Sequence, residues 1–197
     1  MNTPSNHFRI HARRLRAFTQ VELLAVLVVF GLLVLMTIPA MSKARDRRNR
    51  IACVNNLKNI GLAFRIFRGE NFPWNLDTDR GGTIHFATNP AALWRHLVAI
   101  SNEMGDPKRF ICPSDLERRS AASWSEFTNN HFVSYALGFS ATEETPQSIL
   151  AADRNIRLDG AVLTNVILSF PSNVVVTFDQ RLHNGAGNLM LGDGSVQ

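Results

Sequence analysis

The 197-residue sequence predicts an α+β fold, in which one long N-terminal helix precedes a small head that contains the strands. Residues 23–41 contain no charged side chain, and further apolar residues follow at spacings of 4, 3, 4 and 3, at Cys53, Leu57, Ile60, Phe64 and Phe67. Such spacing places side chains on one helical face, which we expect to pack against a sheet. Short runs of β-branched and aromatic residues between turn-forming residues indicate the strands, mostly after position 109.

Composition and charge narrow the class of protein. Hydrophobic residues make up 45% of the chain and charged residues 19%, which excludes bulk disorder. A mean hydropathy of -0.04 excludes several membrane spans. The net charge of +5 comes from four arginines in residues 1–17 and five basic residues in 43–50, because the chain after position 50 has 12 basic and 14 acidic residues. We therefore expect no nucleic-acid partner, and the 43–50 block fits a solvated collar near lipid phosphates better than filament salt bridges or DNA capture.

The apolar run from Leu23 to Met41 has the length of a membrane-spanning helix. It covers 19 residues with a single hydroxyl, on Thr37, and about 20 apolar residues cross a bilayer as a helix. A secretory signal has a shorter apolar core, although residues 39–42 loosely imitate a cleavage site. Basic residues flank both ends of the run, so the positive-inside rule does not decide its orientation.

One helix is expected to continue from about residue 19 to about residue 68. Pro39 lacks the N–H that would bond to residue 35, so it should kink or locally melt the helix. Residues 69–73, which begin with Gly69 and end with Pro73, are expected to end the helix. Further on, Asn89 and Pro90 open a short helix that reaches Ile100. We expect strands at 109–112, 131–139, 149–152, 161–164, 174–179 and 187–191, with the last two forming a hairpin around residues 183–187.

The segment Phe18-Thr19-Gln20-Val21-Glu22-Leu23-Leu24 resembles the processing motif of type IV prepilins and of the pseudopilins of type II secretion. Gly31 and Pro39 fall where the first helix of that family often carries Gly and Pro. The resemblance implies that a prepilin peptidase cuts between Ala17 and Phe18 and then methylates the new amine of Phe18. It also implies that Glu22 meets the N-terminal amine of a neighbouring subunit during assembly. Ala17 departs from the glycine that this family usually has before the cut.

Three further segments resemble a bacterial group of prepilin-like proteins, abundant in Planctomycetes and Verrucomicrobia, that share an H-x9-DG ending. They are Cys112-Pro113-Ser114-Asp115, Ala152-Asp153-Arg154-Asn155, and His183 with Asp193-Gly194. Members commonly continue beyond the Asp-Gly pair, whereas this sequence ends at Gln197, and a further strand or tail stays an open alternative.

The resemblance divides the chain into a leader (1–17), a transmembrane and processing segment (18–41), the extracytoplasmic half of the helix (42–72) and a pilin-like head (73–197). It implies a structural subunit, a pseudopilin, in a single-pass topology with the N-terminus in the cytoplasm and the head outside the inner membrane. The implied partners are the prepilin peptidase, other pseudopilin subunits, the inner-membrane assembly platform and the membrane itself. The alternatives are a pilin of an adhesive or competence pilus and a membrane-anchored binding domain.

The sequence contains no recognised catalytic motif, so we expect no enzyme activity, cofactor or metal. Calcium binding by Asp153, Asp179 and Asp193 is disfavoured because the alternating calcium-loop pattern is absent. A catalytic triad of Ser169 or Ser195 with His183 lacks the required local context.

The residues also suggest two pairings. We expect His183 and Asp193 to form a structural hydrogen bond that fixes the final turn, in preference to a metal pair with Asp179. Cys53 and Cys112 could form a disulfide outside the cytoplasm, but two separately buried thiols are favoured.

Overall fold

A computed structural model describes residues 19–67, 72–142, 144–162, 167–168 and 175–197. The proposed cleavage position, Ala17 and Phe18, lies outside the described residues. So do Ser169, residues 69–71 of the expected helix stop, and residues 163–164 of one expected strand. The chain divides into two compact units, Met1–Lys43 and Ala44–Gln197, and the following description treats each by itself.

The helix α1 extends over Gln20–Ile66, and its first half is strongly apolar. Its most apolar window has a mean hydropathy of 2.8 and no buried residue, so this helix is long and apolar enough to cross a membrane. The helical backbone continues through Pro39, so the helix is not melted there. A bend at Pro39 stays a prediction.

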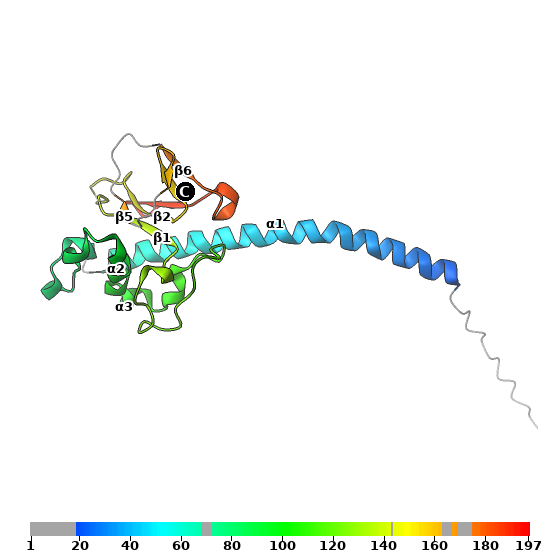
Figure 1. Ribbon diagram of the computed structural model, residues 1–197, viewed down its shortest axis with the longest axis horizontal. Coiled ribbons are helices and arrows are strands. Elements are labelled where there is room, and N and C mark those ends of the chain that lie inside the picture. The colour runs from blue at the N-terminus through cyan, green and yellow to red at the C-terminus, as the bar shows by residue number, and fades with distance from the viewer. Residues whose placement is uncertain (1–18, 68–71, 143, 163–166, 169–174) are drawn as a thin grey trace, which may run out of the picture. The chain divides into compact units, whose positions relative to one another are not determined.

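The second half of α1 forms the base of the core of the head. The predicted stripe is buried along its whole length, with Cys53, Leu57 and Ile60 fully inaccessible and Phe64 and Phe67 at 1% and 5% exposure. These side chains belong to one apolar cluster with residues from the sheet, among them Tyr135, Leu137, Leu150 and Met190. Figure 1 shows the strands beside this cyan part of α1. The expected packing of a helical face on a sheet is therefore confirmed.

Two small sheets make up the β part of the head. The first has the order β5-β1-β2-β7, built from β1 (Tyr135–Gly138), β2 (Ile149–Asp153), β5 (Ile167–Leu168) and β7 (Leu189–Leu191). Its β1–β2 and β2–β7 pairs are antiparallel, whereas β1 and β5 are parallel. The second sheet is antiparallel, with the order β4-β3-β6, from β3 (Ile156–Leu158), β4 (Ala161–Val162) and β6 (Val176–Phe178). The α+β class is confirmed.

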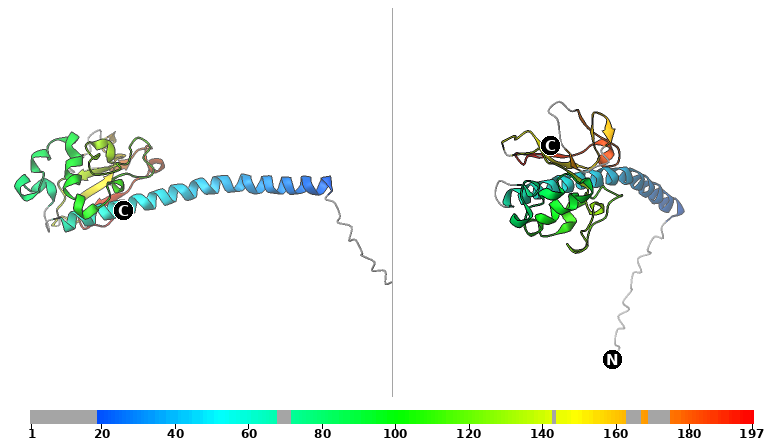
Figure 2. Two further views of the ribbon diagram at one scale, coloured as in Figure 1. Left: turned by 90° about the horizontal axis from the view of Figure 1, so that it is seen from below. Right: turned by 60° about the vertical axis from the view of Figure 1, so that its left-hand side comes forward.

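Short helical elements precede the strands along the chain, except for one turn, η7, which lies between β6 and β7. The α-helices are α2 (Leu93–Ala99) and α3 (Ser101–Met104), and the 3₁₀ turns are η1 (Pro73–Asn75), η2 (Thr78–Arg80), η3 (Ile84–Phe86), η4 (Pro90–Ala92), η5 (Pro107–Phe110), η6 (Asn130–Phe132) and η7 (His183–Gly185). In the right-hand view of Figure 2 the green elements among them, from η1 to η6, and the yellow to red strands gather on separate sides of the head. The Asn89 side chain accepts a hydrogen bond from the Ala91 N–H, which confirms the predicted cap.

Two strand predictions are wrong. The segment 109–112 is not a strand, because the Asp106 side chain caps the Lys108 N–H and Pro107 opens the 3₁₀ turn η5. The hairpin of β6 and β7 does not exist either, because β6 pairs with β3 and β7 pairs with β2 in the other sheet. The segment that connects β6 to β7 is held by Asn155, whose Nδ2 donates to the carbonyl groups of Asp179, Leu182 and Ala186.

The burial of the helical stripe predicts that truncating two leucines of α1 changes the free energy of unfolding by different amounts. We expect Leu57→Ala to lower the free energy of unfolding by about 2 to 5 kcal/mol, because Leu57 is fully buried and its truncation leaves a cavity. Leu62→Ala is the matched control on the same helix, since Leu62 is 57% exposed and should lose less than about 0.5 kcal/mol. Denaturant titration of the full chain in detergent measures both, and equal losses would contradict this packing.

Candidate functional site

The structure brings together residues from all three segments that carry the resemblance to the H-x9-DG group. The Cys112 Sγ atom lies 3.3 Å from His183 Nε2, and the same nitrogen lies 3.5 Å from Asp153 Oδ2. The Ser114 hydroxyl lies 3.4 Å from His183 Nδ1. The side chains of His183 and Asp153 are 2% and 0% exposed, so this is a buried polar cluster. We call Cys53, Cys112, Asp153 and His183 the buried cluster.

A disulfide joins Cys53 of α1 to Cys112 in this cluster. The favoured expectation of two separate thiols is therefore wrong. The reason is geometric: the turn after η5 brings the Cα atom of Cys112 to 5.2 Å from that of Cys53, inside the range that a disulfide requires. Both cysteines are fully buried. A disulfide of this kind is typical of a domain outside the cytoplasm.

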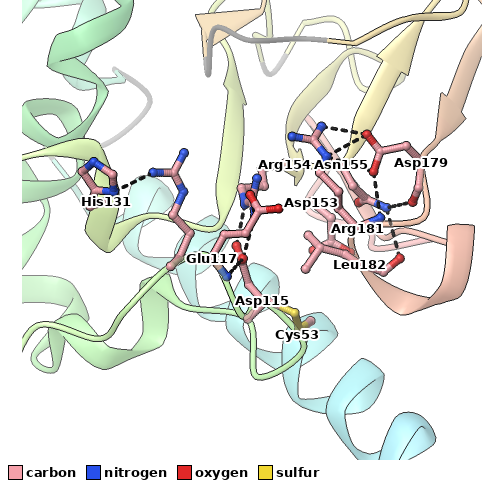
Figure 3. A network of polar contacts seen from close by, with 12 residues as sticks. Cys53, Asp115, Glu117, His131, Asp153, Arg154, Asn155, Asp179, Arg181 and Leu182 are labelled. Carbon is pink, nitrogen blue, oxygen red and sulfur yellow. Dashed lines mark hydrogen bonds and ion pairs between the residues drawn. A yellow bond between two sulfur atoms is a disulfide. The ribbon is translucent and has the colours of Figure 1, made fainter.

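Next to the disulfide, Arg154 forms a buried ion pair with Asp115. Its Nε and Nη2 donate to the two carboxylate oxygens of Asp115 at 2.5 and 2.7 Å, and Nη2 also donates to Glu117 at 2.8 Å. Figure 3 shows these contacts beside Cys53 and Asp153. Burial alone would raise the pKa of Asp115, but the Arg154 guanidinium and the Ser134 hydroxyl outweigh burial and hold the pKa below its ordinary value. The pair fixes the 112–117 segment to the end of β2.

Asp153 is held by Asn188, at the start of the segment that leads into β7. The Asn188 backbone N–H and its Nδ2 donate to Asp153 Oδ2 at 2.8 and 2.7 Å, and Arg50 of α1 donates to Asn188 Oδ1 at 3.2 Å. Burial raises the pKa of Asp153 to about 7, although the Asn188 hydrogen bonds lower it in part. Burial also lowers the pKa of His183, and the Arg50 charge adds to that effect.

The expected hydrogen bond between His183 and Asp193 is not formed. His183 faces Asp153 and Cys112 instead, because the loop after β6 folds back over the disulfide. Asp193 is exposed and caps the Ser195 N–H at 2.8 Å, in a turn where Gly194 has a φ of 81° that favours glycine. Arg65 of α1 donates to the Asp193 carbonyl. Asp193 and Gly194 thus form a turn that rests on the helix.

The three aspartates considered for calcium have separate partners. Asp153 accepts from Asn188, Asp193 caps Ser195, and Asp179 is bonded by the guanidinium of Arg181 at 2.8 and 3.0 Å. Figure 3 shows Asp179 and Arg181 together near Asn155. Each carboxylate therefore stabilises a different loop.

Glu22 caps its own helix. The Thr19 backbone N–H and hydroxyl donate to Glu22 Oε2 at 2.8 and 2.9 Å, and the Glu22 N–H donates to Thr19 Oγ1 at 3.3 Å. This reciprocal pattern is a capping box, which satisfies backbone donors at a helix start. The Thr-x-x-Glu spacing could have predicted this cap, which the interpretations of Glu22 as a head-group-level residue or as the partner of a neighbouring amine do not include. Glu22 is exposed, so its second oxygen is open to such a partner.

Sequence reasoning missed several residues that organise the cluster, namely Arg50, Ser114, Asp115, Arg154, Asn155 and Asn188. The quoted segments contain four of them, but spacing along a chain carries no signal for which side chains meet. Arg50 was assigned only to the basic collar, whereas its guanidinium reaches into the head.

No family model, curated protein or solved structure matches this chain. The class of protein therefore follows from the structure alone. A long apolar N-terminal helix is followed by a small sheet domain, which is consistent with a pilin-like architecture. The disulfide in that domain is of the extracytoplasmic type.

The buried ion pair leads to a prediction about Asp115. We expect Asp115→Asn to destabilise the head by about 3 kcal/mol, at the lower end of the range for breaking a buried pair, because Glu117 still bonds the guanidinium of Arg154. Glu117→Gln is the matched control and should cost less than about 1 kcal/mol, since its side chain is 62% exposed. Denaturant midpoints of the full chain measure both variants, and equal losses of stability would contradict the buried ion pair.

The pH dependence of the free energy of unfolding tests the same ion pair between Asp115 and Arg154. Because the pKa of Asp115 is lowered in the folded state, its contribution is present above the unfolded pKa of about 3.9 and is lost as the pH falls through the folded value. The stability difference between the wild type and Asp115→Asn should therefore shrink at acid pH. A difference that grows on acidification would contradict the ion pair.

The disulfide predicts the labelling of the two cysteines. We expect no maleimide incorporation when the purified chain is denatured without reductant, and two labels per chain after reduction, because Cys53 and Cys112 are the only cysteines. Intact mass measures the labels. Two labels without reductant would show that the thiols are separate.

Proposed function

We propose that the chain is a structural subunit, a pseudopilin, of a membrane-anchored filament in a type II secretion-like system. The observation that carries the proposal is the first half of α1, an exposed apolar helix with one carboxylate, Glu22, at its start. This helix continues as the core helix of a disulfide-bonded head. A subunit of this kind needs an anchor that also packs against neighbouring helices, and α1 offers both.

Gly31 supports helix packing between subunits. A Cβ atom added at Gly31 would meet no atom of the described chain within 4 Å, so the fold of the single chain gives no reason for a glycine here. Small residues in membrane helices let neighbouring helices approach closely. We assign Gly31 to such a contact.

Maturation in this proposal follows the resemblance of residues 18–24. The prepilin peptidase removes residues 1–17 and methylates the amine of Phe18, and the mature chain then joins other pseudopilin subunits at the inner-membrane assembly platform. The disulfide agrees with a head outside the cytoplasm. An adhesive or competence pilus would use the same anchor, and a retraction ATPase encoded nearby would favour that alternative.

The first test is the mass of the mature protein. We expect membrane-extracted chain to begin at a methylated Phe18, because the residues around Ala17 resemble the processing site. Intact mass and N-terminal peptide analysis measure this. A product that begins at Met1, or one cut near Ala40, would overturn the proposed maturation, and faster cleavage of Ala17→Gly would show that the alanine slows it.

The second test separates two roles of Glu22. Glu22→Ala removes both the capping acceptor and the charge, whereas Glu22→Gln keeps the acceptor for Thr19 and removes only the charge. If the carboxylate meets the amine of a neighbouring subunit, both variants should insert normally but form fewer multimers.

Crosslinking between subunits in the membrane measures the multimers. A loss in Glu22→Ala with normal assembly of Glu22→Gln would restrict Glu22 to capping. Undiminished multimers in both variants would overturn the assembly role and favour a membrane-anchored binding domain.

A further inference from the structure

We propose that the head binds a zinc ion when the Cys53–Cys112 disulfide is reduced, with Cys53, Cys112, Asp153 and His183 as its ligands. One donor atom from each of these residues lies within 4.8 Å of the other three. This set differs from the residues that the sequence suggested for a metal, because Asp179 and Asp193 face elsewhere. The inference is independent of the proposed filament function.

The distances in the buried cluster suit a tetrahedral ion. Zinc bonds of about 2.0 to 2.3 Å place neighbouring ligand atoms roughly 3.3 to 3.8 Å apart. The separation of Cys112 Sγ from His183 Nε2 is 3.3 Å, and that of His183 Nε2 from Asp153 Oδ2 is 3.5 Å. The two sulfur atoms are too close for zinc, because they are bonded to each other. Reduction removes that bond and lets them separate.

The surroundings of the buried cluster hold its ligands in place. Asn188 donates two hydrogen bonds to Asp153 Oδ2, and Ser114 lies against the far nitrogen of His183. Such contacts orient the ligands of metal sites. Asp153 Oδ1 is buried and has no hydrogen-bond partner among the described residues. A cation bound to the Asp153 carboxylate would offset the cost of leaving this oxygen unpaired in the interior.

The charge and softness of the donors favour zinc. Two thiolates, an imidazole and a carboxylate form a donor set that zinc accepts and that magnesium and calcium do not. Three anionic ligands around a divalent ion leave a net charge of about one negative unit on the site. The positive charge of Arg50 partly balances it, because Arg50 is bonded to Asn188, which in turn is bonded to the ligand Asp153. Reduction by a water-soluble phosphine balances as one phosphine, one disulfide and one water giving one phosphine oxide and two thiols.

The experiment compares zinc binding by the oxidised and reduced full chain in detergent. After phosphine treatment, incubation with zinc and removal of free metal, we expect one zinc ion per reduced chain and none on the oxidised chain. Cobalt(II) in place of zinc should give thiolate charge-transfer bands and the strong visible bands of a tetrahedral site. Asp153→Asn and His183→Gln should each weaken zinc binding by at least about tenfold.

The controls are Asp193→Asn and His131→Gln, which remove exposed side chains of the same types outside the buried cluster and should bind zinc like the wild type. Near-ultraviolet circular dichroism reports folding of each reduced protein. If a reduced variant is unfolded without metal, the measurement is whether zinc restores its signal as it should for the wild type. The proposal is overturned if oxidised and reduced chains bind alike, or if Asp153→Asn and His183→Gln bind, or refold with, zinc as the wild type does.

Discussion

Four apolar side chains of α1, at Cys53, Leu57, Ile60 and Phe64, and that of Phe67 just after it are buried beneath the head, and the main apolar core of the head is built on that face. The sheet contributes Met190 and Leu137 to the same cluster, and α2 contributes Leu93 and Leu97. Polar contacts follow the same helix, because Asn56 donates to the Ile111 carbonyl and Arg65 to the Asp193 carbonyl. The disulfide adds a covalent link at the first residue of the stripe. A head of this size has a small core, so a helix that serves as its centre limits how far the strands can shift.

The last two residues of β2 and the two residues that follow it connect the remaining segments. Ala152 lies in the sheet, and each of the next three side chains forms hydrogen bonds with a different loop. Asp153 accepts from Asn188, and Arg154 donates to Asp115. Asn155 donates to the loop after β6. Each of these groups is buried, and a buried polar group is costly unless it is bonded. Changing one partner therefore leaves another unsatisfied, so the loops around the disulfide are coupled to one another.

The sequence was sufficient for the elements with strong local patterns. Periodicity alone predicted α1 and its buried face, and an Asn-Pro pair predicted the start of the helical segment before Ile100. It was not sufficient for pairing between distant segments. The runs that became β6 and β7 have the composition of a hairpin. Their pairing in different sheets goes with contacts between distant segments, such as those of the Asn155 side chain with carbonyl groups 24 to 31 residues away, which leave no local pattern in the sequence.

The same limit applies to the candidate site. The structure brings the segments around Cys112, Asp153 and His183 together, yet the sequence suggested a partner for His183 from its own end of the chain. A residue ten positions away in sequence is an obvious partner for a hairpin, but here the strands are not paired with each other. The disulfide was disfavoured for a similar reason, because the distance between two Cα atoms depends on the whole fold.

The exposed face of α1 in the head unit bears on whether the helix is only an anchor. Ile51, Leu62 and Ile66 are between 55% and 59% exposed, although they belong to the Ala44–Gln197 unit, past the basic residues that begin at Lys43. A helix that served only as a lipid anchor would have little use for large apolar side chains beyond such a basic block, where polar residues are the usual surface. In the proposed filament, helices of neighbouring subunits would cover these side chains, since full burial of each contributes roughly 1.5 to 3 kcal/mol. This distribution favours a subunit whose helices contact one another beyond the membrane as well as within it.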